Sequence, residues 1–180
     1  MVNTRQKQES HMDNKVRLNI GCGAKKLDGY INIDVSKKHK PDIVADMRQL
    51  PFKSNSVDEI YADNVLEHMS DFVGAMKEMH RVLKKGGKLF IIVPAPTVVS
   101  AYIPQHQHYF SYTSFMPFEL GDVHDDYYDF HFSKVMTRYT FEFINRIIQP
   151  LTDSGHVWVY ERTFLSHLFP AVELRAELVK

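Results

Sequence analysis

The chain has 180 residues, and its 22 Lys and Arg balance its 22 Asp and Glu. This length favours one domain with a single core, and the zero net charge gives no overall field that attracts nucleic acid or an anionic membrane, so we expect neither as a partner. A single cysteine, Cys22, excludes an internal disulfide and gives no cysteine-based zinc site.

The chain begins with a polar stretch, residues 1–14, which we expect to be a disordered tail ahead of one domain over residues 15–180. No apolar run comes near the ~18 residues that a membrane span needs. A cytoplasmic location is therefore the expectation.

Short apolar segments alternate with turn-forming residues through the first half of the chain. They predict strands at residues 16–20, 30–34, 42–45, 57–62 and 88–93. Ser70 and Asp71 are expected to cap a longer helix, which ends in a basic turn before Gly86 and Gly87. Strands that alternate with helical connections imply an α/β fold with a mostly parallel sheet, which binds ligands at the carboxyl ends of its strands.

The regular pattern stops between residues 95 and 137, where aromatic residues are frequent but no period is clear. A long irregular segment in a compact domain is typically a lid or a binding loop, and this one is too aromatic for disorder, so we expect a substrate lid. Beyond it we expect a helix over residues 138–148 and two strands over residues 157–164 and 172–179.

Two glycines, Gly21 and Gly23, directly follow the first predicted strand, and Asp34 ends the second. Glycine lets the backbone approach a ligand closely, and a carboxylate at the end of the neighbouring strand can accept hydrogen bonds from ribose hydroxyls. This pattern predicts a site for a nucleoside cofactor. A dinucleotide site is disfavoured, because its third glycine is missing and Ala24 and Lys25 follow the turn.

Several stretches together resemble the class I S-adenosylmethionine-dependent methyltransferases, in particular a small type 11-like subgroup. They read LNIGCG at 18–23, GYINID at 29–34, D-x-x-x-L-P-F at 46–52, LEH at 66–68 and K-x-G-G at 84–87. The resemblance is dense between residues 16 and 94. It implies a Rossmann-like sheet with helices on both faces, a C-terminal antiparallel hairpin made of the last two predicted strands, and S-adenosylmethionine as the cofactor.

The resemblance also implies a set of cofactor-binding residues: Asn19, Gly21, Cys22, Gly23, Asp34, Val35, Asp46, Met47, Asn64 and His68. In this set Asp34 holds the ribose hydroxyls, and Asp46 lies near the adenine amino group with Met47 beside the ring. Asn64 lines the methionine end. Asn19 departs from the family, in which many members carry an acid just before the glycine turn. Cys22 is expected to be a small packed side chain.

Histidines of the aromatic segment are the candidate catalytic groups. His106 or His108 is the predicted general base, because an imidazole can take up a proton near neutral pH, and Tyr109 is the predicted orienting hydroxyl. Glu67 and His68 are adjacent, and on a helix their side chains would diverge, so we expect a packing or capping role, with His68 at the edge of the cofactor. The predicted reaction is methyl transfer to an oxygen or nitrogen of a small or medium-sized acceptor, such as a sugar or a polysaccharide precursor.

Two alternatives remain open. One is a cofactor-binding protein that has lost catalysis and serves as a regulatory subunit. The other is a metal-dependent enzyme that combines His106 and His108 with a later set of side chains: Asp122, His124, Asp125, Asp126, Asp129 and His131. Because the spacing of this second set is loose, we predict no metal site.

Overall fold

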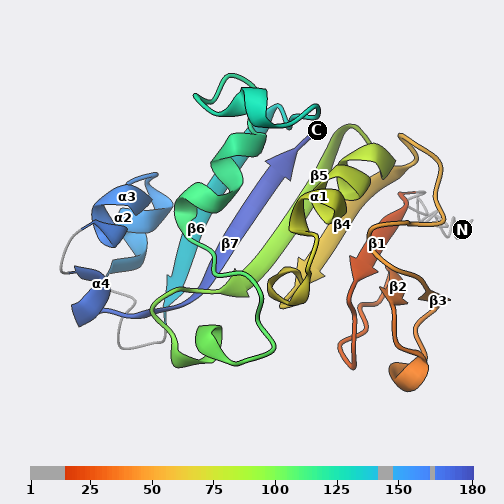
Figure 1. The fold of residues 1–180 in the computed structure, drawn as a ribbon, viewed down its shortest axis with the longest axis horizontal. Helices are drawn as coiled ribbons and strands as arrows, with labels where there is room; N and C mark the ends of the chain where they lie inside the picture. Colours follow the sequence, from red (N-terminus) through yellow and green to blue (C-terminus); the bar gives the residue numbers. More distant parts are fainter. Residues whose placement is uncertain (1–14, 142–147, 163–164) are drawn as a thin grey trace, which may run out of the picture.

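A computed structural model of the chain describes residues 15–141, 148–162 and 165–180 (Figure 1). Its centre is a seven-stranded sheet with the order β3-β2-β1-β4-β5-β7-β6. The strands are β1 (Arg17–Ile20), β2 (Ile31–Asp34), β3 (Ile43–Val44), β4 (Val57–Asp63), β5 (Leu83–Pro94), β6 (Lys134–Phe141) and β7 (Ala171–Val179). Strands β1 to β5 are parallel, and β7 runs antiparallel to both β5 and β6. The predicted Rossmann-like sheet is confirmed.

The helices are short, apart from one. They are α1 (Phe72–Val82), α2 (Gln149–Asp153), α3 (Val157–Glu161) and α4 (Leu165–Leu168), with the 3₁₀ turns η1 (Lys37–His39), η2 (Leu66–His68), η3 (Val99–Tyr102), η4 (Tyr112–Phe118) and η5 (Asp125–Tyr127). The predicted cap of α1 is present, since the Asp71 carboxylate accepts the Gly74 N–H at 2.8 Å. Among the described residues no helix is long and apolar enough to cross a membrane.

One face of the sheet carries the core. Alternate strand residues on this face are buried: Leu18, Ile20, Ile60, Leu89, Ile91, Leu174 and Leu178. The helix α1 and the turn η4 lie over them on the same side (Figure 1). Such alternation is what a strand with one apolar face produces.

The aromatic segment belongs mainly to this core. Phe72 of α1 packs edge-to-face against Phe110, Phe115 and Phe118, with ring centroids 5.2–6.0 Å apart. Phe115 and Phe118 are at most 1% exposed. Their segment therefore forms the layer that a longer helix would otherwise provide. The predicted lid is thus partly core, and its last residues belong to β6, which begins at Lys134.

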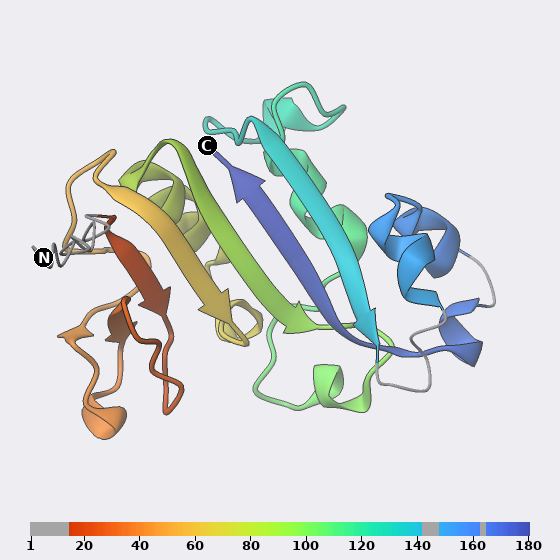
Figure 2. The same ribbon diagram turned by 180° about the vertical axis from the view of Figure 1, so that it is seen from behind.

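The opposite face of the sheet is not covered by any described helix (Figure 2). The links between β1 and β2 (residues 21–30) and between β2 and β3 (residues 35–42) are shorter than the dozen or more residues that a helical crossover usually takes. The expectation of helices on both faces is therefore not met in the described part of the chain. Tyr61, Phe90 and Arg175 lie on this open face.

The C-terminal hairpin differs from the predicted one. Its last strand is the predicted one, β7, but its partner is β6, and residues 157–161 form α3 instead of a strand. The helix predicted over residues 138–148 is also wrong, because residues 138–141 belong to β6; residues 142–147 and 163–164 lie outside the described residues. Buried Tyr139 and Phe141 have the period of two that pairing with β7 requires.

The glycines after α1 are not a helix stop. The helix ends at Val82, and β5 starts at Leu83 and contains both Gly86 and Gly87. A Cβ on Gly87 would lie 2.8 Å from the backbone oxygen of Lys84. The second glycine is therefore required by close backbone packing within the strand.

Candidate functional site

A cavity of about 450 Å³ lies at the carboxyl ends of the parallel strands, where α/β sheets bind ligands. It is lined by Ile20, Gly21, Asp34, Val35, Ala45, Asp46, Met47, Arg48, Asn64, Val65, His68, Met69 and Ser70. Seven of the ten predicted cofactor residues are in this lining: Gly21, Asp34, Val35, Asp46, Met47, Asn64 and His68. Asn19, Cys22 and Gly23 are not.

Gly21 forms the wall of the cavity that faces the loop after β4. Its φ is 65°, and a Cβ there would lie 2.3 Å from Cγ2 of Val65, a distance that no side chain tolerates. Gly23 also has a positive φ, 47°, but a Cβ there meets nothing within 4 Å. The first glycine is thus needed for space and conformation, the second for conformation alone.

The carboxylate of Asp34 is held by two backbone donors. Its Oδ2 accepts the N–H of Gly23 and its Oδ1 accepts the N–H of Ser36, both at 2.8 Å. A carboxylate offers about four lone-pair sites, so each oxygen keeps one for a ligand. Asp34 therefore lines the cavity in a fixed orientation, able to accept hydrogen bonds from two neighbouring hydroxyls.

Asp46 is paired with an arginine that lines the same cavity. Nη2 of Arg48 lies 2.6 Å from Oδ2 of Asp46, and the backbone N–H of Arg48 donates to Oδ1 at 2.8 Å. These hydrogen bonds lower the pKa of Asp46. A ligand amino group at Asp46 must therefore share the carboxylate with Arg48, whose role the sequence did not reveal. Met47 lies between them in sequence and is 6% exposed.

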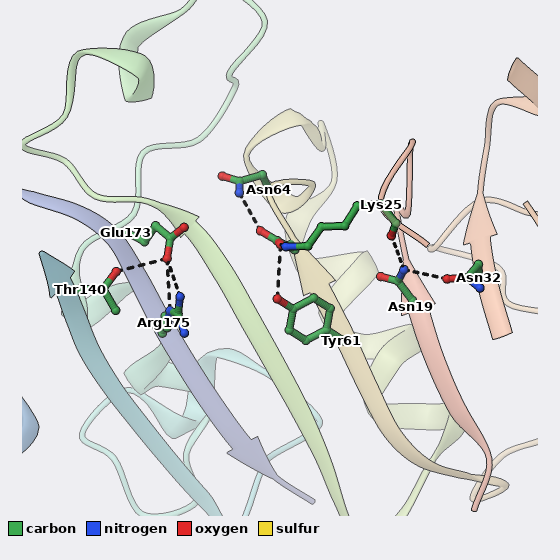
Figure 3. Close-up of polar contacts among 9 residues, drawn as sticks. Asn19, Lys25, Asn32, Tyr61, Asn64, Thr140, Glu173 and Arg175 are labelled. Carbon is green, nitrogen blue, oxygen red and sulfur yellow. Dashed lines mark hydrogen bonds and ion pairs between the residues drawn. The ribbon is translucent and has the colours of Figure 1, made fainter. Parts of the chain in front are cut away.

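Asn19 supports the glycine turn from behind instead of lining the cavity. Its Nδ2 donates to the backbone oxygen of Lys25 at 2.8 Å and to Oδ1 of Asn32 at 2.9 Å (Figure 3). Asn32 was not singled out from the sequence, although it faces Asn19 directly in the β1–β2 register. Cys22 is buried too, and burial raises the pKa of its thiol. This agrees with a packed side chain.

Asp63, the last residue of β4, is a further residue that the sequence did not assign to the site. Its carboxylate pairs with Lys25 of the glycine turn and accepts hydrogen bonds from Tyr61 Oη at 3.3 Å and Asn64 Nδ2 at 2.7 Å (Figure 3). The hydrogen bond to Asp63 raises the pKa of Lys25. Asp63 thus connects the glycine turn to Asn64 in the cavity wall. Its only signal in the sequence was its place at a strand end.

Of the three predicted catalytic residues, His106 is the one that the structure brings beside the cavity. Its ring packs edge-to-face on His68, which lines the cavity, with centroids 4.7 Å apart. Nδ1 of His106 lies 2.9 Å from the backbone oxygen of Ala101, and Nδ1 of His68 lies 3.2 Å from that of Gln105. Both rings are therefore held by the segment that follows β5.

His108 and Tyr109 are directed elsewhere. The His108 ring lies against Phe72 and Phe110, with centroids 5.7 and 6.2 Å away, and its Nε2 is buried without a hydrogen-bond partner. Tyr109 is 57% exposed and stacks on Tyr102. Neither side chain lines the cavity.

The carboxylate of Glu67 lies close to both histidines. It is 1% exposed, its Oε2 is buried without a hydrogen-bond partner, and burial raises its pKa. One ligand atom from each of Glu67, His68 and His106 lies within 4.8 Å of the other two. The expectation that Glu67 only packs, with its side chain turned away from His68, is corrected. The 3₁₀ geometry of η2 and the approach of His106 bring all three together.

The looser set of later carboxylates and histidines does not join this group. Asp129 pairs with Lys77 at 2.6 Å and is largely exposed. A second hollow of about 720 Å³ lies along β6, β7 and the helices α2 and α3, and contains none of the predicted cofactor residues. The 450 Å³ cavity is therefore the candidate site, because it alone of the two combines the glycine turn with Asp34.

Comparisons with known proteins agree with this assignment. Residues 18–91 match the family model described as a methyltransferase domain. The demethylmenaquinone methyltransferase of Corynebacterium glutamicum is 36% identical over 76 residues, which are 42% of this chain and 31% of that protein. The chain spans about a third of the length of the curated relatives that it matches.

Two solved structures have the same fold over almost the whole chain. A SAM-dependent methyltransferase from Archaeoglobus fulgidus has a TM-score of 0.64 at 15% identity, covering 92% of this chain and 86% of that one. Phosphoethanolamine N-methyltransferase 2 from Haemonchus contortus, in complex with S-adenosyl-L-methionine, has a TM-score of 0.57 at 15% identity, covering 92% and 48%. At these identities the likeness shows the fold.

Proposed function

We propose that the chain binds S-adenosylmethionine in the 450 Å³ cavity and transfers its methyl group to a small molecule. The proposal is supported by the match of residues 18–91 to the methyltransferase-domain family model and by the fold that the chain shares with a SAM-dependent methyltransferase. The observation that supports this most directly is the convergence of Gly21, Asp34, Asp46 and Asn64, from the carboxyl ends of β1, β2, β3 and β4, on one cavity.

In this proposal each part of the cofactor contacts a different group of cavity residues. Asp34 accepts the two ribose hydroxyls, since its carboxylate is already oriented by Gly23 and Ser36. Met47 and Val35 offer apolar surface to the adenine ring, and Asp46 accepts from its amino group. Gly21 and Asn64 line the methionine end, next to His68.

The acceptor enters on the side of His68, where the ring of His106 packs against this cavity residue. The proposed acceptor is an oxygen or nitrogen nucleophile of a small or medium-sized molecule. A ring-shaped acceptor such as a saccharide is supported by Tyr102 and Tyr109, two stacked and exposed aromatic rings on the same segment as His106. Because the methyl group is already activated in S-adenosylmethionine, the protein has to align the acceptor and remove its proton.

A second candidate function, a cofactor-binding subunit of a larger assembly, is favoured by the open face of the sheet. No described helix covers that face (Figure 2), and Tyr61 and Phe90 line the 720 Å³ hollow that continues to α2 and α3. A stable complex with a partner chain, together with cofactor binding but no methyl transfer by the isolated chain, would favour this alternative.

Calorimetry tests the cofactor site. S-adenosylmethionine should bind the full chain at a micromolar level, and Asp34→Ala should weaken binding by about 1.5–3 kcal/mol, the scale for hydrogen bonds to a charged acceptor. The matched control is Asp28→Ala, because Asp28 is an exposed aspartate that lies outside the cavity lining. Equal affinities for both variants, or no binding by the unaltered chain, would contradict the assignment.

A further inference from the structure

Three metal-ligating side chains meet at the acceptor side of the cavity. Glu67 and His68 come from η2, and His106 comes from the turn after η3, 39 positions further along the chain. Ligand atoms of the three lie within 4.8 Å of one another. Two imidazoles and one carboxylate at this separation can share a single ion.

The two histidines make the backbone hydrogen bonds that metal-binding histidines commonly make. A backbone carbonyl only accepts hydrogen bonds, so the contacts of Nδ1 with Gln105 and Ala101 place the ring proton on Nδ1 in both. The lone pair of each imidazole is then on Nε2. Histidines that bind metals commonly donate their other N–H to a carbonyl in this manner, which sets the tautomer and the ring orientation.

Glu67 supplies the negative charge that the group needs. Its side chain is 1% exposed, and its Oε2 has no hydrogen-bond partner, which is costly for a carboxylate unless a cation compensates it. The backbone oxygen of Glu67 also accepts the N–H groups of Gln107 at 2.7 Å and His108 at 3.2 Å. These bonds attach the segment of His106 to η2, so the three ligands are positioned before any ion binds.

We propose that Glu67, His68 and His106 bind a divalent cation of the zinc type, with one coordination position open to the cofactor cavity. Two imidazoles and one carboxylate suit zinc, whereas magnesium and calcium prefer oxygen ligands. The open position follows from His68, which is exposed and lines the cavity. The ion has a path from solvent on that side, while Glu67 closes the site from within. This site replaces the looser His/Asp set considered from the sequence.

The role of the ion rests on the proposed methyl transfer. An ion held by Glu67, His68 and His106 would bind a hydroxyl acceptor through its oxygen and would lower the pKa of that hydroxyl. The O–H bond breaks and its proton passes to water. The oxygen then forms a bond to the methyl carbon, and the C–S bond breaks with its electron pair remaining on sulfur. The products are a methyl ether and S-adenosylhomocysteine.

Zinc calorimetry on the full chain, after removal of bound metal with a chelator, tests the site without cofactor or acceptor. One zinc ion per chain should bind, and magnesium should not compete. His68→Ala, His106→Ala and Glu67→Gln should each weaken binding by at least about 10-fold, since even the loss of a group that only orients a ligand costs this much. The matched control is His124→Ala, whose ring is exposed and stacks on Tyr127.

The outcomes separate this site from the cofactor site. The proposal would be overturned if the unaltered chain does not bind zinc, or if zinc binding survives all three substitutions. S-adenosylmethionine affinity is measured separately, without zinc, so a failed cofactor site is distinguishable from a failed metal site. If Glu67→Gln does not fold, the exposed residue His68 still decides the result, because its removal leaves the core unchanged.

Discussion

The side-chain amide of Asn19 donates to the side-chain oxygen of Asn32 at 2.9 Å, and the two residues are also register partners of β1 and β2. Both are almost fully buried, at 3% and 6% exposure. Nδ2 of Asn19 also holds the backbone oxygen of Lys25, and Oδ1 of Asn32 accepts the N–H of Leu27 at 2.8 Å. This amide pair therefore anchors Lys25 and Leu27, which follow Gly21 and Gly23 in the link between β1 and β2.

Substitution of Asn19 should consequently affect stability as well as binding. Asn19→Ala leaves the backbone oxygen of Lys25 without this donor, and we expect the free energy of unfolding to fall by about 1–3 kcal/mol. Urea denaturation measures the loss. S-adenosylmethionine affinity should fall as well, although Asn19 does not line the cavity, because the turn loses its support. Unchanged stability would show that the amide pair is dispensable.

Alanine at the two glycines should have unequal effects. Gly21→Ala places a Cβ 2.3 Å from Val65 and also strains a positive φ, so we expect a loss above about 3 kcal/mol, whereas Gly23→Ala strains φ alone and should cost about 1–2 kcal/mol. Thermal or chemical denaturation of both variants makes the comparison. Adding Val65→Ala to Gly21→Ala should recover part of the loss, because it removes the closest atom. Equal losses at the two positions would contradict the packing argument.

His80 should make stability depend on pH. Burial against Phe130 and Phe132 lowers its pKa from 6.5 to about 4. Between pH 6.5 and about 4, the unfolded chain therefore carries a proton on His80 that the folded chain does not. The stabilising effect is complete above pH 6.5 and is lost as the pH falls towards 4, by on the order of 1–3 kcal/mol for a half-buried group.

Urea denaturation between pH 7.5 and 4 measures this dependence. His80→Gln should flatten it in that range, whereas the exposed control His124→Ala should leave it intact. Carboxylates with lowered pKa values, such as Asp58 and Glu78, contribute to the pH dependence in all three proteins and therefore cancel in the comparison. Identical pH profiles would show that His80 titrates normally.

Truncation before Ala171 should abolish folding. It removes β7, which pairs with β5 on one side and β6 on the other and buries Leu174 and Leu178. The remaining sheet would lose its connection to β6 and expose the backbone edge of β5. Circular dichroism and thermal melting of the truncated chain provide the measurement. A soluble product with a cooperative transition would contradict the central position of β7.

The sequence by itself determined the first half of the protein. The strands β1, β2, β4 and β5, the Asp71 cap and the cavity residues around Gly21 and Asp34 follow from patterns that span only a few residues. Apolar runs, a capping side chain and glycines at positive φ are stabilised by neighbours along the chain, so they can be recognised before the fold is known. The roles of Asn32 and Asp63 could not be recognised in this way, because Asn32 meets Asn19 on another strand and Asp63 pairs with Lys25, which lies 38 positions earlier in the chain.

The tertiary structure decided the second half and the chemistry at the cavity. Residues 134–141 are a strand because β7 lies beside them, and the phenylalanines after residue 109 enter the core because the α1 face of the sheet has room for them. The meeting of Glu67 with His106 depends on the backbone bonds that attach residues 107 and 108 to η2. Such contacts join residues far apart in the chain, and their free energy exists only once the whole sheet has formed.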